Sequence, residues 1–145
     1  MNLNRDEVRA AAKRLQDKVI HTSVISIGRR LNLKLESEQH SGSFKARGAM
    51  NAMLCSDVGP DGVVAASGGN HGAAVAWAAQ ALGYQANIFV PSIISPSKLK
   101  RLESYGAQIH VVGVEYQESL EAARAFQAGR QCVELHAYDQ PEILL

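Results

Sequence analysis

The sequence predicts an α/β fold built around a small parallel sheet, and three observations predict it. Short apolar, β-branched runs recur at nearly even spacing, a helical pattern separates each run from the next, and a glycine closes each helical pattern. The four runs cover residues 63–66, 88–90, 109–112 and 132–135. Strands that alternate with helices form right-handed crossovers. We therefore expect a four-stranded open sheet covered on both faces, a three-layer α/β/α arrangement.

The three intervening helices are defined by their ends and their composition. Residues 71–82 are rich in alanine and are followed by Gly83, which suits the end of a helix. The second helix is expected between a cap at Ser95 and a stop at Gly106, and the third before Gly129. The third carries one apolar stripe, made of Tyr116, Leu120, Ala123 and Phe126. A basic cluster on the second helix is expected to face solvent, namely Lys98, Lys100 and Arg101.

The N-terminal and C-terminal segments add two helices and one strand. Asn4 with Glu7 predicts a capping box that opens a helix running to Leu15. The alternating pattern of residues 31–35 is typical of a strand. Pro141 suits the first turn of a final short helix. Because apolar residues follow that turn at once, we expect the chain to be the front portion of a longer protein.

Composition and charge exclude several classes of protein. The chain has 145 residues, of which 46% are hydrophobic and 20% charged, and a net charge of +1, so it is neither a disordered tail nor a charge-rich coiled coil. No broad basic surface is expected, which argues against nucleic acid as the main partner. Its apolar runs are far shorter than the ~20 residues that span a bilayer.

The cysteines and histidines indicate a cytoplasmic domain without a metal site. Cys55 and Cys132 form a poor disulfide framework, so we expect buried free thiols in a reducing compartment. The histidines are scattered without metal-ligand spacing, and no Cys/His cluster exists in the sequence, so we expect no bound metal.

The first segment that can carry chemistry covers residues 36–49. Its lysine, Lys45, follows a turn of small residues and is flanked by Gly42 and Gly48, a setting in which backbone can pack closely around a bound group. A lysine amine in such a place can form a Schiff base with a carbonyl compound. The alternative is a surface lysine at the start of a helix.

The second segment, Ser-Gly-Gly-Asn-His-Gly at residues 67–72, follows the first predicted strand and opens the alanine-rich helix. Ligands of open α/β sheets bind at the carboxyl ends of strands, and backbone N–H groups at a helix start attract anions. The segment fits neither the nucleoside-triphosphate loop G-x-x-x-x-G-K-[ST] nor the dinucleotide pattern G-x-G-x-x-G. The alternative is a turn that only reverses the chain.

Together the two segments resemble the fold-type II enzymes that use pyridoxal 5′-phosphate (PLP), and within them the serine/threonine dehydratase group that includes serine racemases. Residues 36–49 match that family's E-x-x-Q-x-[ST]-G-S-F-K-x-R-G-A stretch at every fixed position, and residues 67–71 match its S-x-G-N-H loop. The family's H-T-P stands here as His21 and Thr22, with Ser23 in place of proline. The resemblance covers nearly the whole chain.

The resemblance implies a role for each matching residue. Lys45 is expected to form the Schiff base with PLP and to remove the substrate's α-proton. Phe44 is expected to pack beside the cofactor, and Asn70 to hydrogen-bond its ring hydroxyl. The substrate carboxylate is expected to lie against the loop residues Ser67, Gly68, Gly69, Asn70 and His71.

The implied reaction is loss of the β-hydroxyl from serine- or threonine-type amino acids, which yields a 2-oxo acid and ammonia. Serine racemases carry a second serine where this chain has Gly68, which favours a dehydratase over a racemase of the same family. Cysteine synthase relatives have a different lysine motif, so that function is disfavoured. Ala73 replaces the glutamine often found after the loop.

The resemblance also implies a division into two domains and an incomplete site. Residues 1–50 are expected to be the N-terminal part of the large PLP domain, and residues 51–145 the small α/β domain. The family's phosphate loop falls beyond these positions, so we expect little activity from this chain alone. Three alternatives stay open: an inactive binding or assembly module, a homo-oligomer, and pairing with a separately made C-terminal half.

Overall fold

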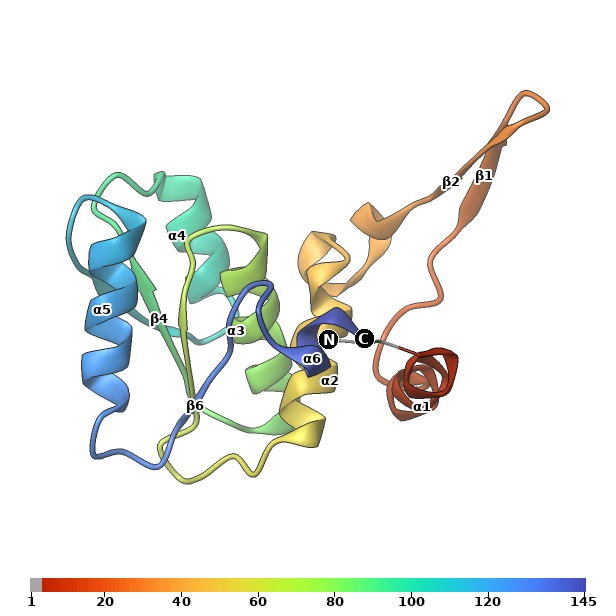
Figure 1. The fold of residues 1–145 in the computed structure, drawn as a ribbon. Helices are drawn as coiled ribbons and strands as arrows, with labels where there is room; N and C mark the ends of the chain where they lie inside the picture. Colours follow the sequence, from red (N-terminus) through yellow and green to blue (C-terminus); the bar gives the residue numbers. More distant parts are fainter. Residues whose placement is uncertain (1–3) are drawn as a thin grey trace.

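The computed structural model describes residues 4–145 as a three-layer α/β body with a β-hairpin projecting from it (Figure 1). A four-stranded, fully parallel sheet forms the middle layer, in the order β5-β4-β3-β6. Its strands are β3 (Val63–Ala66), β4 (Ala86–Val90), β5 (Gln108–Val111) and β6 (Val133–Glu134). The predicted parallel sheet is confirmed, although β4 begins two residues earlier than expected and β6 is short.

The alternation of side chains along the central strands explains the two outer layers. Val63 and Ala65 of β3 belong to one buried cluster, whose helical members come mostly from α2 (Lys45–Cys55) and α3 (Asn70–Leu82). Val64 and Ala66 belong to a second cluster, which is closed by Leu120 and other residues of α5. Successive strand residues point to opposite faces of a sheet. The sheet is therefore covered on both faces, as Figure 1 shows with α5 lying across the sheet from α3.

Except for α2, whose range the sequence analysis did not predict, the α-helices of the described chain lie close to their predicted positions. They are α1 (Arg5–Leu15), α2 (Lys45–Cys55), α3 (Asn70–Leu82), α4 (Pro96–Glu103), α5 (Tyr116–Gln127) and α6 (Pro141–Leu144), with two 3-10 turns, η1 (Glu36–Glu38) and η2 (His40–Gly42). The capping box of Asn4 and Glu7 opens α1 as predicted. Gly83 ends α3 with a φ of 78°, a left-handed conformation that glycine adopts without strain.

The hairpin is the largest departure from the predicted fold. Residues 31–35 form a strand as expected, β2 (Leu31–Lys34), but it pairs antiparallel with β1 (Val24–Ile27), which the sequence analysis did not predict. All eight strand residues are exposed, including Val24, Ile25 and Leu33. Figure 1 shows the hairpin extending away from the α/β body.

Helix α2 connects the segment that carries Lys45, residues 36–49 (the lysine segment), to the core. It packs against α3 and α6, and it spans the expected domain boundary near residue 50, so that division stays a prediction. A β-carbon on Gly48 would lie 2.3 Å from the carbonyl oxygen of Ile143, and only glycine permits this close approach of α6. Both cysteines are free: Cys132 is buried as expected, whereas Cys55, the last residue of α2, is exposed.

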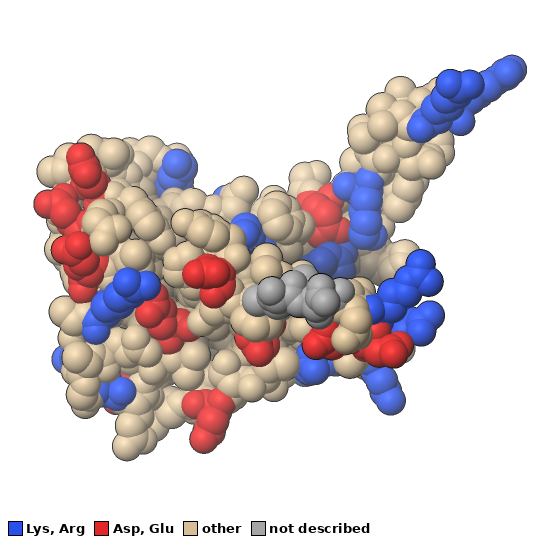
Figure 2. All heavy atoms as spheres, in the orientation of Figure 1, with Lys and Arg blue, Asp and Glu red and all other residues tan. Residues whose placement is uncertain are grey.

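Charge is distributed unevenly over the surface. Figure 2 shows basic side chains along the hairpin and acidic side chains gathered over α5, on the face in view. The net charge of +1 therefore reflects a balance between separated regions. Among residues 4–145, none of the helices has the length and apolar character needed to cross a membrane.

Candidate functional site

The segment that leads to Lys45 is fixed by a network of polar side chains. The guanidinium of Arg47 donates two hydrogen bonds to the carboxylate of Glu36, at 2.9 and 2.7 Å, and the Thr22 hydroxyl donates a third at 2.7 Å. These contacts, the Arg47 hydrogen bond above all, hold the pKa of Glu36 below its ordinary value of 4.5, although burial opposes them. The carboxylate therefore stays ionised and ties α2 to the chain before β1.

Gln39 fixes the same segment from its other side. Its amide nitrogen donates to the carbonyl of Ile20 at 2.8 Å, and its amide oxygen accepts from the Ile20 N–H at 3.0 Å. The turn that follows uses left-handed backbone at Ser41 and Gly42, with φ values of 57° and 66°. The fixed glutamate, glutamine and arginine of the motif thus shape the backbone that presents Lys45.

Lys45 is the first residue of α2, and its side chain is half-buried. Its amine donates to the carbonyl oxygen of Ala137 at 2.6 Å and lies 5.2 Å from the centre of the Phe44 ring. No carboxylate among residues 4–145 pairs with this amine. The Phe44 ring is 58% exposed, so one aromatic face beside the amine is free to contact a ligand.

The glycine loop, residues 67–72, joins the end of β3 to the start of α3. Its backbone is packed so closely that Gly72 has no room for a side chain. A β-carbon on Gly72 would lie 1.9 Å from the carbonyl oxygen of Ser67. The Ser67 hydroxyl accepts a hydrogen bond from the Gly69 N–H at 3.3 Å. A cavity of about 270 Å³ lies against the loop, lined by Ser67, Gly68, Gly69, Pro91, Ile93, Ile94, Lys98 and Tyr116. The loop therefore presents backbone and one hydroxyl to this cavity.

His71, the fifth residue of the glycine loop, has a buried side chain, and only 4% of the residue's surface is exposed. Its Nε2 lies 2.8 Å from the carbonyl oxygen of Leu135, which can only accept, so Nε2 carries the proton. Burial lowers the pKa of His71 to about 4, and the charges of Lys45 and His136 contribute. The imidazole is therefore neutral at pH 7, and its Nδ1 has no partner among the described residues.

The two segments meet at the stretch that follows β6. The carbonyl of Leu135 accepts from His71, and the carbonyl of Ala137, two residues on, accepts from Lys45. A single short stretch of backbone thus contacts both predicted segments. The hydroxyls of Ser41 and Ser43, just before Lys45, are also buried without a hydrogen-bond partner in residues 4–145. Buried polar atoms left unpaired are costly, and their concentration here is typical of a ligand site.

Asn70 has a contact that the sequence analysis missed. The Arg101 guanidinium donates to the Asn70 side-chain oxygen at 3.2 Å. The expectation that the basic cluster faces solvent holds for Lys98 and Lys100, which are exposed, whereas Arg101 is partly buried and makes its hydrogen bond to Asn70 at the surface. The amphipathic pattern of α4 gives no signal for this contact, because it depends on how α4 lies against α3.

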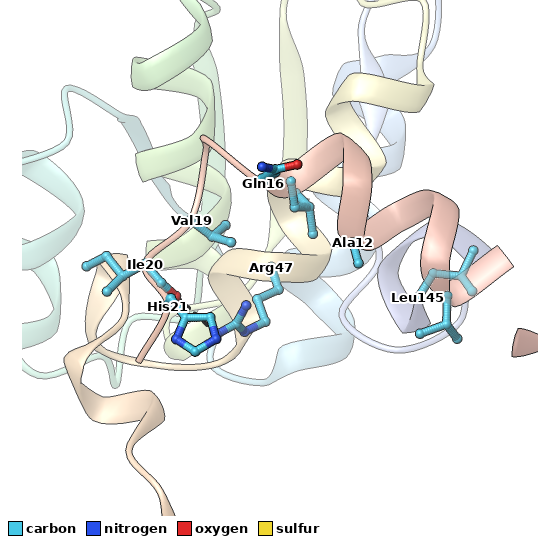
Figure 3. Close-up of a pocket in the computed structure, with 9 residues that line it drawn as sticks. Ala12, Gln16, Val19, Ile20, His21, Arg47 and Leu145 are labelled. Atoms are coloured by element: carbon cyan, nitrogen blue, oxygen red, sulfur yellow. Dashed lines mark hydrogen bonds between the residues drawn. The ribbon is translucent and has the colours of Figure 1, made fainter. Parts of the chain in front are cut away.

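A second hollow, of about 320 Å³, lies outside this site (Figure 3). It is lined by Val8, Ala12, Leu15, Gln16, Val19, Ile20, His21, Arg47 and Leu145. None of the predicted catalytic or binding residues lines it. Among residues 4–145, no three histidine, cysteine, aspartate or glutamate side chains are grouped so that they could hold a metal ion.

Residues 18–145 match the protein family described as pyridoxal-phosphate dependent enzyme. The L-threonine ammonia-lyase of Thermotoga maritima is 36% identical over 148 residues, which cover 96% of this chain and 37% of that protein. Two solved structures share the fold: maize serine racemase (TM-score 0.93, 30% identity, 99% of this chain and 46% of that one) and the threonine deaminase of T.th. (0.89, 34%, 98% and 47%). This chain spans less than half the length of each.

Proposed function

This chain belongs to the family of pyridoxal-phosphate dependent enzymes, and on that premise we propose that it forms part of a serine/threonine-type dehydratase. The enzyme removes the β-hydroxyl and the amino group of a hydroxyamino acid, and releases a 2-oxo acid and ammonia. One observation carries the proposal. The lysine segment and the glycine loop, which are far apart in the sequence, both bind the backbone of residues 135–137, through Lys45 and His71.

The described residues fit the ring end of PLP. The cofactor carries an aldehyde, and Lys45 offers an amine that is half-buried and pairs with no carboxylate of residues 4–145. Two buried hydroxyls without partners precede it, on Ser41 and Ser43, and can accept or donate to a bound group. The Asn70 amide lies at the start of α3, where a ring hydroxyl can be bound.

The residues divide the chemistry among them. Bound PLP supplies an electron sink for the substrate's α-carbon. Lys45 Nζ would hold the cofactor through its aldehyde and would take the substrate's α-proton. Asn70 orients the ring through its hydroxyl. The backbone N–H groups of the glycine loop and of the first turn of α3 bind the substrate carboxylate, since a helix start favours an anion. Phe44 packs against the cofactor.

Gly68 favours elimination over racemisation in this proposal. Racemisation needs a second group that delivers a proton to the opposite face of the α-carbon, and Gly68 carries no side chain to do so. A β-carbon at this position would also lie 2.7 Å from the Ile94 side chain. Racemase activity stays a weaker candidate, supported by the fold shared with maize serine racemase.

The activity is proposed for the whole protein. This chain spans 37% to 47% of the three relatives named above, and we propose that turnover uses residues from their remaining length. Residues 1–50 then belong to the large domain and residues 51–145 to the small one. The proposed small-molecule partner is a hydroxyamino acid substrate, and the proposed location of the protein is the cytoplasm.

Borohydride trapping tests the proposal directly. The 145-residue chain is incubated with PLP, reduced, digested and mapped by mass spectrometry, and release of 2-oxo acid from serine and threonine is assayed in parallel. Before reduction we expect an absorbance band at about 410–430 nm, and after reduction a PLP adduct on Lys45. The Lys45→Ala variant is expected to lose both, because it lacks the amine that the proposal assigns to the cofactor.

The matched control is Lys100→Ala, which removes an exposed lysine from α4 and is expected to leave the adduct unchanged. An adduct spread evenly over surface lysines, or one that persists in Lys45→Ala, would contradict the proposal. So would a Lys45 adduct whose yield is unchanged when serine or threonine is added before the reduction.

A further inference from the structure

We infer that Arg101 is a positioning residue that fixes the orientation of the Asn70 amide at the cofactor site. The inference rests on the proposed function, and it assigns a role to a residue outside both motif segments. Arg101 lies on α4, which packs beside α3, and its side chain reaches the start of α3. Its guanidinium donates to the Asn70 side-chain oxygen at 3.2 Å.

The same guanidinium lies against the lysine segment. A β-carbon on Gly42 would lie 3.3 Å from Nη2 of Arg101, closer than most real contacts of such atoms. Gly42 has a left-handed φ of 66° and belongs to η2, three residues before Lys45. Arg101 thus lies between the two segments that carry the proposed chemistry, with one amino group on Asn70 and the other beside the turn at Gly42.

The charge of Arg101 is not used in an ion pair. Four pairs of basic and acidic side chains lie within 4 Å of each other among residues 4–145, and none of them includes Arg101. The hydrogen bond to Asn70 is the one that its guanidinium makes within that part of the chain. A partly exposed arginine whose guanidinium has a single neutral acceptor is therefore available to stabilise that acceptor.

The chemistry of the pair determines which way Asn70 faces. A guanidinium only donates, so the atom it contacts must be the amide oxygen, and the amide cannot turn over without losing this bond. The Asn70 NH₂ group is left without a partner among the described residues, and it can only donate. Asn70 is consequently held as a hydrogen-bond donor, which suits a ring hydroxyl oxygen that carries negative charge.

The test compares Arg101→Met, which keeps the length of the side chain but removes the donor, with Lys100→Met, the adjacent exposed position. The first readout needs no cofactor: the side-chain amide signals of Asn70 in a ¹⁵N NMR spectrum, assigned by their loss in Asn70→Ala. We expect these signals to shift in Arg101→Met and to stay in place in Lys100→Met.

The second readout is PLP binding, which is measured as the affinity for PLP and as the position of the absorbance band. Loss of one hydrogen bond that orients the amide is expected to weaken PLP about 3- to 10-fold and to shift the band. Arg101→Lys, which keeps a cationic donor on a shorter side chain, is expected to recover part of the affinity. A residue needed only for folding would not be rescued in this way.

The outcomes separate this inference from the proposed function. Asn70 signals that are identical in wild type and Arg101→Met would overturn the inference, and so would PLP binding that is unchanged in Arg101→Met while Lys45 still takes the adduct. Full-length protein that forms no adduct at Lys45 would overturn the proposed function instead, while the NMR comparison on this chain would still decide whether Arg101 orients Asn70.

Discussion

The lysine segment and the glycine loop are held in place by opposite means. The lysine segment depends on side chains that are present, since Arg47 bonds to Glu36, and Gln39 and Arg47 both bond to the backbone of Ile20. The glycine loop depends on side chains that are absent, since the loop closes into space that a β-carbon on Gly72 would fill. A fixed residue in a sequence motif can therefore mark a bond or a lack of room, and the two respond differently to substitution.

The largest effect is expected in the glycine loop. Gly72→Ala places a methyl group 1.9 Å from the Ser67 carbonyl oxygen, so backbone must move, and we expect a loss of roughly 3 kcal/mol or more in the free energy of unfolding. Urea denaturation measures it. Gly69→Ala is the matched control in the same loop, because its nearest contact would be 3.9 Å away, and it is expected to be nearly neutral. Equal losses in both variants would contradict this account.

A change of similar size is expected from pH at His71, a buried residue of the glycine loop. Its folded pKa of about 4 lies below the ordinary value of 6.5, so the unfolded chain takes up its proton first. The contribution of neutral His71 to the free energy of unfolding is therefore fully present above pH 6.5. It decreases as pH falls, and the protein is roughly 3 kcal/mol less stable at pH 4 for this reason. Denaturation at a series of pH values should show this slope in wild type.

Two variants separate the effect of His71 on the pH dependence of stability from the effect of the carboxylates. His71→Asn is expected to flatten the stability between pH 6.5 and 4, whereas His21→Asn, at an exposed position, should keep it. If both variants retain the wild-type slope, protonation of His71 is not the cause.

A smaller effect is expected in the lysine segment. Arg47→Met removes both hydrogen bonds to Glu36, and we expect a loss of about 1–3 kcal/mol in stability at pH 7. The Glu36 pKa should rise toward 4.5, measured by NMR titration, because Arg47 is the main cause of its lowering. Stability gained by that lowering is present above pH 4.5 and is lost below it, so the variant should be less sensitive to acid. Arg30→Met, in the turn of the exposed hairpin, is the control and should change neither quantity.

The parallel sheet could be predicted from the sequence because its strands carry their own signal. β3 and β4 are buried on both faces, and such strands are continuous apolar runs. β6 is weaker: only two of its four predicted residues pair with β3, at the edge of the sheet. Helix ends were predictable from Gly83 and the capping box at Asn4, which act locally.

The hairpin and Arg101 could not be predicted for a different reason. The alternating pattern of residues 31–35 indicated one strand of the hairpin, but Val24–Ile27 is a short run that ends at Gly28 and is exposed on both faces, so burial left no pattern to detect in it. Arg101 reaches Asn70 only because two helices lie side by side, and such contacts are absent from the sequence of either helix. The predicted roles of Lys45 and the loop residues came from the resemblance, and they stay predictions.

One stacking contact gives the molecule an internal optical probe. Trp77, the single tryptophan of the chain, stacks on the His40 ring with centroids 4.6 Å apart and planes 13° from parallel. Trp77 belongs to α3 and His40 to η2, so this pair joins the helix after the glycine loop to the turn before Lys45. Any event that separates the two, whether unfolding or ligand entry, changes the surroundings of one indole. Its emission can therefore report on that junction in unmodified protein, with no dye attached.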